Sequence, residues 1–147
     1  MSSPSVRVAF ICVQNAGRSQ MATAFAEQER RERGLENEVD ILTGGTQPAE
    51  YVHEIVVEVM NEAGFDLTER TPHAITPDEL DQTDIVVTMG CSASTVCPAR
   101  WSGENRDWAL DDPDGRNLDE VREIRDEVRR RVREFFDELE QRVVRRV

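Results

Sequence analysis

The sequence predicts an α/β fold with a parallel sheet, because short apolar segments alternate with amphipathic segments along the chain. The apolar segments are rich in β-branched residues, which is typical of buried strands. The amphipathic segments repeat their apolar residues every three or four positions, which is typical of helices. At 147 residues the chain is long enough for one core and short for two. We therefore expect a single three-layer domain over residues 1–147, with helices on both faces of the sheet.

Each element has its own signal in the sequence. Strands are predicted at 6–13, 38–43 and 84–89, with a fourth, shorter one at 107–110 (DWAL). Helices are predicted at 19–33, ending before Gly34, at 52–63, ending before Gly64, and at 117–147. A further short helix begins after Thr76, because Pro77 and Glu79 follow it in the pattern of a capping box.

The composition limits the classes of partner. Thirty acidic residues face eighteen basic ones, all arginine, and the net charge is -12. Such a surface repels nucleic acid and anionic membranes. The acidic, lysine-free composition indicates a halophilic protein, and the plainer alternative is an acidic cytosolic one. No stretch is apolar enough to span a membrane or to serve as a signal peptide, so we predict a cytoplasmic location. There, three cysteines indicate catalysis, redox chemistry or metal binding rather than structural disulfides.

The stretch 12-CVQNAGRS-19 joins the first predicted strand to the first predicted helix. Backbone N–H groups in such a loop can turn inward and, together with the helix dipole, hold an oxyanion. The predicted oxyanion-binding residues are Val13, Gln14, Asn15, Ala16, Gly17 and Arg18.

Side chains in this loop suit nucleophilic chemistry on a tetrahedral anion. Arg18 offers a planar fork for two oxygens. Asn15 can adopt a left-handed conformation and brace the loop, and Gly17 allows close approach. Cys12 would lie beneath the anion as a thiolate, with Ser19 donating a hydrogen bond to the sulfur, ready for in-line attack. The alternative is that Cys12 belongs to the core and Arg18 to the surface, which the strand–loop–helix context disfavours.

A leaving oxygen needs a proton, and the stretch 110-LDDPDG-115 offers a carboxyl group for it. Asp112 precedes Pro113, which fixes the turn, so its carboxyl group could point back over the loop as a general acid. Alone, the same residues would be an ordinary Asp-Pro turn.

These motifs resemble the low-molecular-weight tyrosine phosphatase fold family, and the resemblance covers nearly the whole chain. It implies a four-stranded parallel sheet, Cys12 as nucleophile, Arg18 as oxyanion clamp and Asp112 as general acid.

The stretch 87-VTMGCSASTVCPAR-100 is similar to the redox loop of the arsenate reductases built on this fold. The resemblance implies that Cys12 forms an adduct with arsenate, that Cys91 attacks Cys12 to release arsenite, and that Cys97 takes over the disulfide. An external thiol then reduces that disulfide. No bound cofactor is expected. The spacing of Cys91 and Cys97 lies between those of the thioredoxin-coupled and mycothiol-coupled types, so thioredoxin, a glutaredoxin-like protein and a small thiol all stay open as reductants.

Other interpretations also stay open. A phosphatase acting on phosphomonoesters would need Cys12 alone, and reduction could coexist with a weak phosphatase side activity. Three thiols could instead bind arsenite or zinc in a protein that is not an enzyme, although the spacing is unlike that of known zinc sites. His53 and His73 are expected at the surface or as helix caps, and no metal ligand is assigned. The protein is expected to be a monomer or weak dimer.

Overall fold

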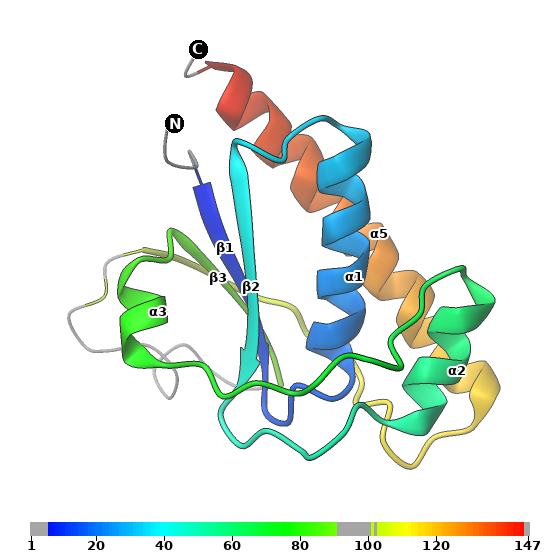
Figure 1. Ribbon diagram of the computed structural model, residues 1–147. Coiled ribbons are helices and arrows are strands. Elements are labelled where there is room, and N and C mark those ends of the chain that lie inside the picture. The colour runs from blue at the N-terminus through cyan, green and yellow to red at the C-terminus, as the bar shows by residue number, and fades with distance from the viewer. Residues whose placement is uncertain (1–5, 91–100, 102, 146–147) are drawn as a thin grey trace.

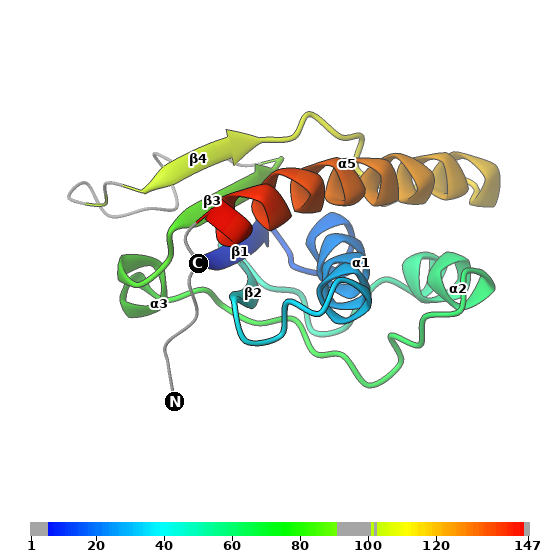
Figure 2. The same ribbon diagram turned by 90° about the horizontal axis from the view of Figure 1, so that it is seen from above.

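The computed structural model describes residues 6–90, 101 and 103–145 of the chain. Four parallel strands form one sheet in the order β2-β1-β3-β4 (Figures 1 and 2). The strands are β1 (Val6–Cys12), β2 (Val39–Gly45), β3 (Ile85–Met89) and β4 (Glu104–Asp107). This arrangement confirms the predicted four-stranded α/β fold.

Helices cover both faces of the sheet (Figures 1 and 2). They are α1 (Arg18–Glu32), α2 (Glu54–Glu62), α3 (Pro77–Asp81) and α5 (Leu118–Arg145). Helices α1, α2 and α5 lie on one side, over the larger apolar core, which includes Phe10, Phe25 and Phe136. Helix α3 lies on the other side, where Leu80 packs in a smaller cluster with Ile11 of β1. The predicted capping box of α3 is confirmed: the Thr76 hydroxyl and the Glu79 carboxylate each bond the other residue's backbone N–H.

The strand register brings the carboxyl ends of three strands to one edge of the sheet. Cys12, the last residue of β1, pairs with Gly45 at the end of β2 and with Met89 at the end of β3. In open parallel sheets, ligands bind at this edge, near the point where the strand order reverses. Strand β2 lies on one side of β1 and strand β3 on the other, so the strand order reverses at β1. That point is therefore next to Cys12, the last residue of β1.

The fourth strand lies three residues earlier than the sequence predicted. We expected it at 107–110, but β4 spans Glu104–Asp107 and pairs only with β3. An edge strand buries little apolar surface. In β4 the side chains of Glu104 and Arg106 form ion pairs instead of packing in the core. The apolar residue that misplaced the prediction, Trp108, follows the strand and packs against Phe10 and Phe135.

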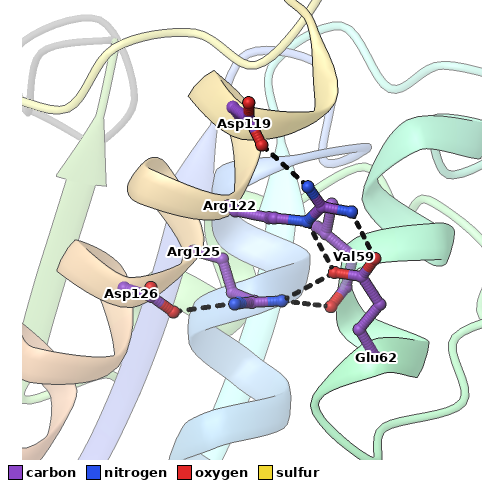
Figure 3. A network of polar contacts seen from close by, with 6 residues as sticks. All are labelled: Val59, Glu62, Asp119, Arg122, Arg125 and Asp126. Carbon is purple, nitrogen blue, oxygen red and sulfur yellow. Dashed lines mark hydrogen bonds and ion pairs between the residues drawn. The ribbon is translucent and has the colours of Figure 1, made fainter.

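An ion-pair cluster joins α2 to α5 (Figure 3). Arg122 donates two hydrogen bonds to the carboxylate of Glu62, at 2.9 and 2.8 Å. Arg125 donates to the carbonyl oxygen of Val59 at 2.8 Å, in the last turn of α2. The hydrogen bond from Arg122 is the largest influence on Glu62, and it holds the pKa of that carboxyl below its usual range. The C-terminal turn of α2 is therefore tied to α5 by charge as well as by packing.

No helix within the described part of the chain is both long and apolar enough to cross a membrane.

Candidate active site

The loop between β1 and α1 turns its carbonyl groups outward. Three backbone N–H groups from the segment after β2 hold these carbonyls. The bonds run from Gln47 to Val13 (2.8 Å), from Ala49 to Gln14 (2.9 Å) and from His53 to Ala16 (3.0 Å). In addition, the side chain of Gln20 donates to the Asn15 carbonyl at 3.1 Å. Because these carbonyls are held by other segments, the N–H groups of the loop, apart from that of Asn15, can turn toward an anion.

The sulfur of Cys12 lies at the start of this loop and is almost fully buried, with the residue 3% exposed. It accepts a hydrogen bond from the backbone N–H of Asn15 at 3.2 Å. The hydroxyl of Ser19 lies 2.8 Å from the same sulfur. Two polar contacts therefore converge on one buried sulfur atom.

Asn15 organises these contacts. Its φ of 51° confirms the predicted left-handed conformation, and the residue is completely buried. Its side-chain NH₂ donates to the hydroxyls of Ser19 (2.7 Å) and Thr43 (2.8 Å). An amide NH₂ can only donate, so the Ser19 oxygen accepts from Asn15 and its own hydrogen is free to point at Cys12.

The other end of the Asn15 amide is held by a nearby residue of α1 and by a residue far along the chain. Its oxygen accepts from the side chain of Gln20 at 3.1 Å and from the backbone N–H of His73 at 2.9 Å. The imidazole of His73 in turn bonds Glu79 at 3.0 Å. Burial opposes ionisation of Glu79, but hydrogen bonds from His73 and Thr76 outweigh burial and lower the pKa of this carboxyl.

Gln20, Thr43 and His73 were not among the predicted site residues. Thr43 and His73 reach Asn15 across 28 and 58 positions of the sequence. Only the position of Gln20, a polar residue on the buried face of a predicted helix, could have indicated a role.

Arg18 is the first residue of α1 and curls over the loop. Its guanidinium donates to the carbonyl oxygen of Leu110 at 2.9 Å and lies 3.7 Å from the carboxylate of Asp112. Gly90, with a φ of 80°, lies against the same guanidinium: a Cβ there would be 2.5 Å from its Nη2 atom. The Arg18 side chain is only 11% exposed, so its charge is held at the pocket by packing on one side and hydrogen bonding on the other.

Asp112 is the more exposed partner, with 61% of its side chain accessible. Its carboxylate accepts from the N–H of Asp114 at 3.0 Å, which fixes the turn around Pro113. Pro113 itself packs against the loop, since a Cβ on Gly17 would lie 2.8 Å from its ring. Gly17 therefore lets the Asp-Pro turn approach the loop, which brings the Asp112 carboxyl group to the pocket.

A pocket of about 220 Å³ forms between these elements. Its lining residues are Cys12, Val13, Gln14, Gly17, Arg18, His53, Gly90 and Asp112. The structure thus brings together the predicted nucleophile, the predicted arginine and the predicted acid. Cys91 and Cys97 lie outside the described residues, although Cys91 follows the pocket residue Gly90 in the sequence.

One of the two histidines has a role that the sequence did not indicate. His53 stands at the N-cap position of α2, as expected, but its side chain makes no capping hydrogen bond; it is half-buried and lines the pocket. His73 is exposed at the surface, as expected, and its ring is bonded to Glu79. Within residues 6–90, 101 and 103–145, no group of three or more cysteine, histidine or acidic side chains is arranged to hold a metal ion.

Comparison with known proteins supports this reading of the pocket. A protein of Halobacterium salinarum, provisionally named arsenate reductase, is 59% identical over 145 residues, which is 95% of this chain and 97% of the relative. An arsenate reductase of Bacillus cereus is 34% identical over 129 residues, covering 87% of this chain and 92% of that protein. The Halobacterium relative also accords with the predicted halophilic character.

A solved structure gives the same picture of the fold. The thioredoxin-dependent arsenate reductase of Corynebacterium glutamicum superposes with a TM-score of 0.76 at 33% identity. The alignment covers 96% of this chain but 65% of that one, so this protein spans just under two thirds of the Corynebacterium protein. Residues 7–145 match the family described as low molecular weight phosphotyrosine protein phosphatase. The chain belongs to that family.

Proposed function

We propose that this protein is an arsenate reductase that uses Cys12 as its nucleophile and Cys91 and Cys97 as a disulfide relay. The observation that carries the proposal is the environment of the Cys12 sulfur. The sulfur accepts a hydrogen bond from the Asn15 N–H and lies 2.8 Å from the Ser19 hydroxyl, in a pocket that Arg18 and Asp112 also line. Relatives named arsenate reductases support the reductase branch of the family.

The first step is a displacement at arsenic. The Cys12 thiolate attacks As(V), and an As–O bond breaks as a sulfur–arsenic bond forms. The departing oxygen takes a proton from the Asp112 carboxyl group and leaves as water. The loop N–H groups and the Arg18 guanidinium hold the remaining oxygens and stabilise the negative charge on them.

The second step transfers electrons. A thiolate, assigned to Cys91, attacks the Cys12 sulfur, and the electron pair of the sulfur–arsenic bond stays on arsenic, which becomes As(III) and leaves as arsenite. Cys97 then attacks Cys91, so that Cys12 is released as a thiolate and the disulfide moves to the Cys91–Cys97 pair. An external dithiol restores both thiols. The thioredoxin-dependent Corynebacterium structure supports a thioredoxin-like reductant over a small thiol.

A phosphatase is the second candidate, because the family is described by that activity and the pocket contains its requirements. In that reaction Cys12 attacks phosphorus, Asp112 protonates the leaving alcohol, and water hydrolyses the intermediate. No atom changes its oxidation state in this reaction, so it needs neither Cys91 nor Cys97. The third candidate, a protein that only binds arsenite or a metal, leaves the oxyanion pocket without a purpose.

A single-turnover experiment tests the proposal. Fully reduced protein is mixed with arsenate in high salt without added reductant, and arsenite and free thiols are counted together. We expect one arsenite per chain, two thiols lost and a Cys91–Cys97 linkage in peptide maps. In Cys97→Ser the disulfide should instead be trapped between Cys12 and Cys91. If no arsenite forms while p-nitrophenyl phosphate is hydrolysed, the protein is a phosphatase. Arsenite that appears only after a small thiol is added would exclude the internal relay.

A further inference from the structure

We propose that the imidazole of His53 is a specificity group of the anion pocket, which binds the one substrate oxygen that an ester would use to carry its organic group. The proposal rests on the proposed function, because it takes the pocket around Cys12 to be an oxyanion site. It predicts that His53 favours a free inorganic oxyanion, such as arsenate, over a phosphomonoester.

The backbone of His53 is fixed to the anion loop. Its N–H donates to the carbonyl oxygen of Ala16 at 3.0 Å, and its own carbonyl accepts from Val56 and Val57 in the first turn of α2, both at 3.0 Å. The backbone of His53 is therefore tied to both the loop and the helix. The fold thus places this residue at the pocket, whose lining includes its side chain.

The ring of His53, by contrast, has no hydrogen-bond or ion-pair partner among the residues that the structure describes. The other histidine, His73, has its ring bonded to the Glu79 carboxylate. An imidazole has at least one N–H donor in either protonation state. A half-buried donor with no protein partner, in the wall of a pocket built for an anion, is available to a substrate oxygen.

In-line attack places the leaving oxygen of the substrate on the side of the pocket away from the Cys12 sulfur, where His53 could contact it. The loop surrounds the sulfur of Cys12, so its N–H groups and Arg18 take the three oxygens nearest to the base of the pocket. In-line attack requires the fourth oxygen to point away from the sulfur, toward the residues that come from outside the loop. Among the described residues of the lining, those with acidic or basic side chains that come from outside the loop are His53 and Asp112.

The segments that carry His53 and Asp112 both approach Gly17. A Cβ built on Gly17 would lie 2.8 Å from the Pro113 ring, which follows Asp112, and 3.7 Å from Cδ2 of His53. A hydroxyl-type oxygen at this point can accept from the imidazole and take a proton from the carboxyl group. In a monoester the same oxygen carries carbon and has less capacity to accept, and its organic group must pass between the two walls. The contact with the imidazole should therefore strengthen binding of the free anion more than binding of the ester.

The test measures binding without turnover. Inorganic phosphate, a stand-in for arsenate that cannot be reduced, and phenyl phosphate are each titrated for protection of Cys12 from iodoacetamide, with alkylation of that residue read by mass spectrometry. In His53→Leu we expect the dissociation constant of inorganic phosphate to rise about tenfold, as expected for a lost hydrogen bond to a charged group. That of phenyl phosphate should change less than about twofold. His53→Gln, which keeps a donor, should recover most of the phosphate affinity.

Tyr51→Leu is the matched control, because this exposed aromatic residue lies two positions earlier on the same segment and does not line the pocket. It should change neither dissociation constant. Equal weakening of both ligands in His53→Leu would overturn the specificity role, and no weakening of either would overturn the contact itself. If inorganic phosphate fails to protect Cys12 even in the unaltered protein, the proposed oxyanion function fails with it. Should His53→Leu not fold, His53→Ala, which also lacks a donor, replaces it in the comparison with His53→Gln.

Discussion

The hydroxyl of Ser19 lies 2.8 Å from the sulfur of Cys12 and accepts a hydrogen bond from Asn15 at 2.7 Å. Because the Asn15 NH₂ group can only donate, the single hydrogen of the Ser19 hydroxyl is left free to point at the sulfur. Asn15 thus orients Ser19 toward Cys12, and a serine at the start of α1 becomes a hydrogen-bond donor that is available to the sulfur.

Ser19→Ala should lower arsenate turnover by about tenfold to a hundredfold, the size expected for the loss of one hydrogen bond to a charged group. The rate at which iodoacetamide alkylates Cys12 at a fixed pH should also change, because the sulfur loses one of its two polar contacts. Thr23→Val is the control, since the Thr23 hydroxyl bonds the Ser19 carbonyl at 2.7 Å in the same helix but does not contact the sulfur. An unchanged alkylation rate in Ser19→Ala would argue against a donor at the sulfur.

Asn15 combines a backbone role with a side-chain role, and two substitutions separate them. Asn15→Gly keeps the left-handed backbone but removes the amide that holds Ser19, Thr43 and His73. Asn15→Ala removes the amide and also strains a residue whose φ is 51°. We expect both to lose most activity, and Asn15→Ala to be the less stable by about 1 kcal/mol. Urea unfolding of the two variants measures the difference, and equal stability would mean that the loop relaxes without cost.

The sequence predicts those parts of the site that lie within one continuous stretch. Cys12, Asn15, Arg18 and Ser19 fall within eight positions of each other, and the strand-to-helix context is enough to predict their arrangement. The brace around Asn15 could not be predicted in this way. Thr43 contributes a hydroxyl and His73 a backbone N–H, and a backbone group has no sequence signature at all. Such contacts become visible only when the register of β1 and β2 is known.

The same limit explains the misplaced fourth strand and the role of His53. Strand β4 is stabilised by pairing along one edge and by ion pairs, so its sequence, ENRD, lacks the apolar pattern on which strand prediction depends. His53 lines the pocket because its N–H bonds Ala16, 37 positions earlier in the chain. Neither property is local, whereas the helices and the other three strands have local periodicity and were predicted to within a few residues.

Asp112→Asn should reduce both arsenate turnover and any hydrolysis of p-nitrophenyl phosphate by about a hundredfold or more, because the leaving oxygen loses its proton donor. The loss should be smallest for ester substrates whose alcohol leaves readily without a proton. Asp111→Asn serves as the control, since it makes the same charge change at the preceding exposed position, which does not line the anion pocket. If Asp112→Asn slows esters of poor and good leaving groups by equal factors, Asp112 is not the acid.

The ion-pair cluster of Figure 3 should make stability depend on pH and on salt. The pKa of the Glu62 carboxyl is lowered in the folded protein, first by its hydrogen bond from Arg122. Its contribution to stability is therefore present above the ordinary pKa of glutamate and is lost as the pH falls through the lowered folded value. Salt screens exposed pairs, so Glu62→Gln should lower the melting temperature more in dilute buffer than in molar salt.

Thermal melts at several pH values and salt concentrations measure this effect. Glu58→Gln is the matched control: Glu58 is exposed on the same helix, and no ion pair of its carboxylate occurs among the described residues. A melting temperature for Glu62→Gln that falls equally at low and high salt would indicate lost packing rather than a lost ion pair.

Gly90 should be required for the position of Arg18 rather than for folding. Gly90→Ala places a Cβ 2.5 Å from Nη2 and 2.8 Å from Cζ of the guanidinium, at a residue whose φ is 80°. Gly64→Ala imposes a similar backbone strain at a φ of 91°, but a Cβ there meets nothing within 4 Å. The two variants should therefore lose similar stability, while only Gly90→Ala displaces Arg18 and raises the KM for arsenate, by about tenfold or more. Urea unfolding and steady-state kinetics on both variants separate the two effects, and an equal rise in KM would show that backbone strain alone, without displacement of Arg18, weakens anion binding.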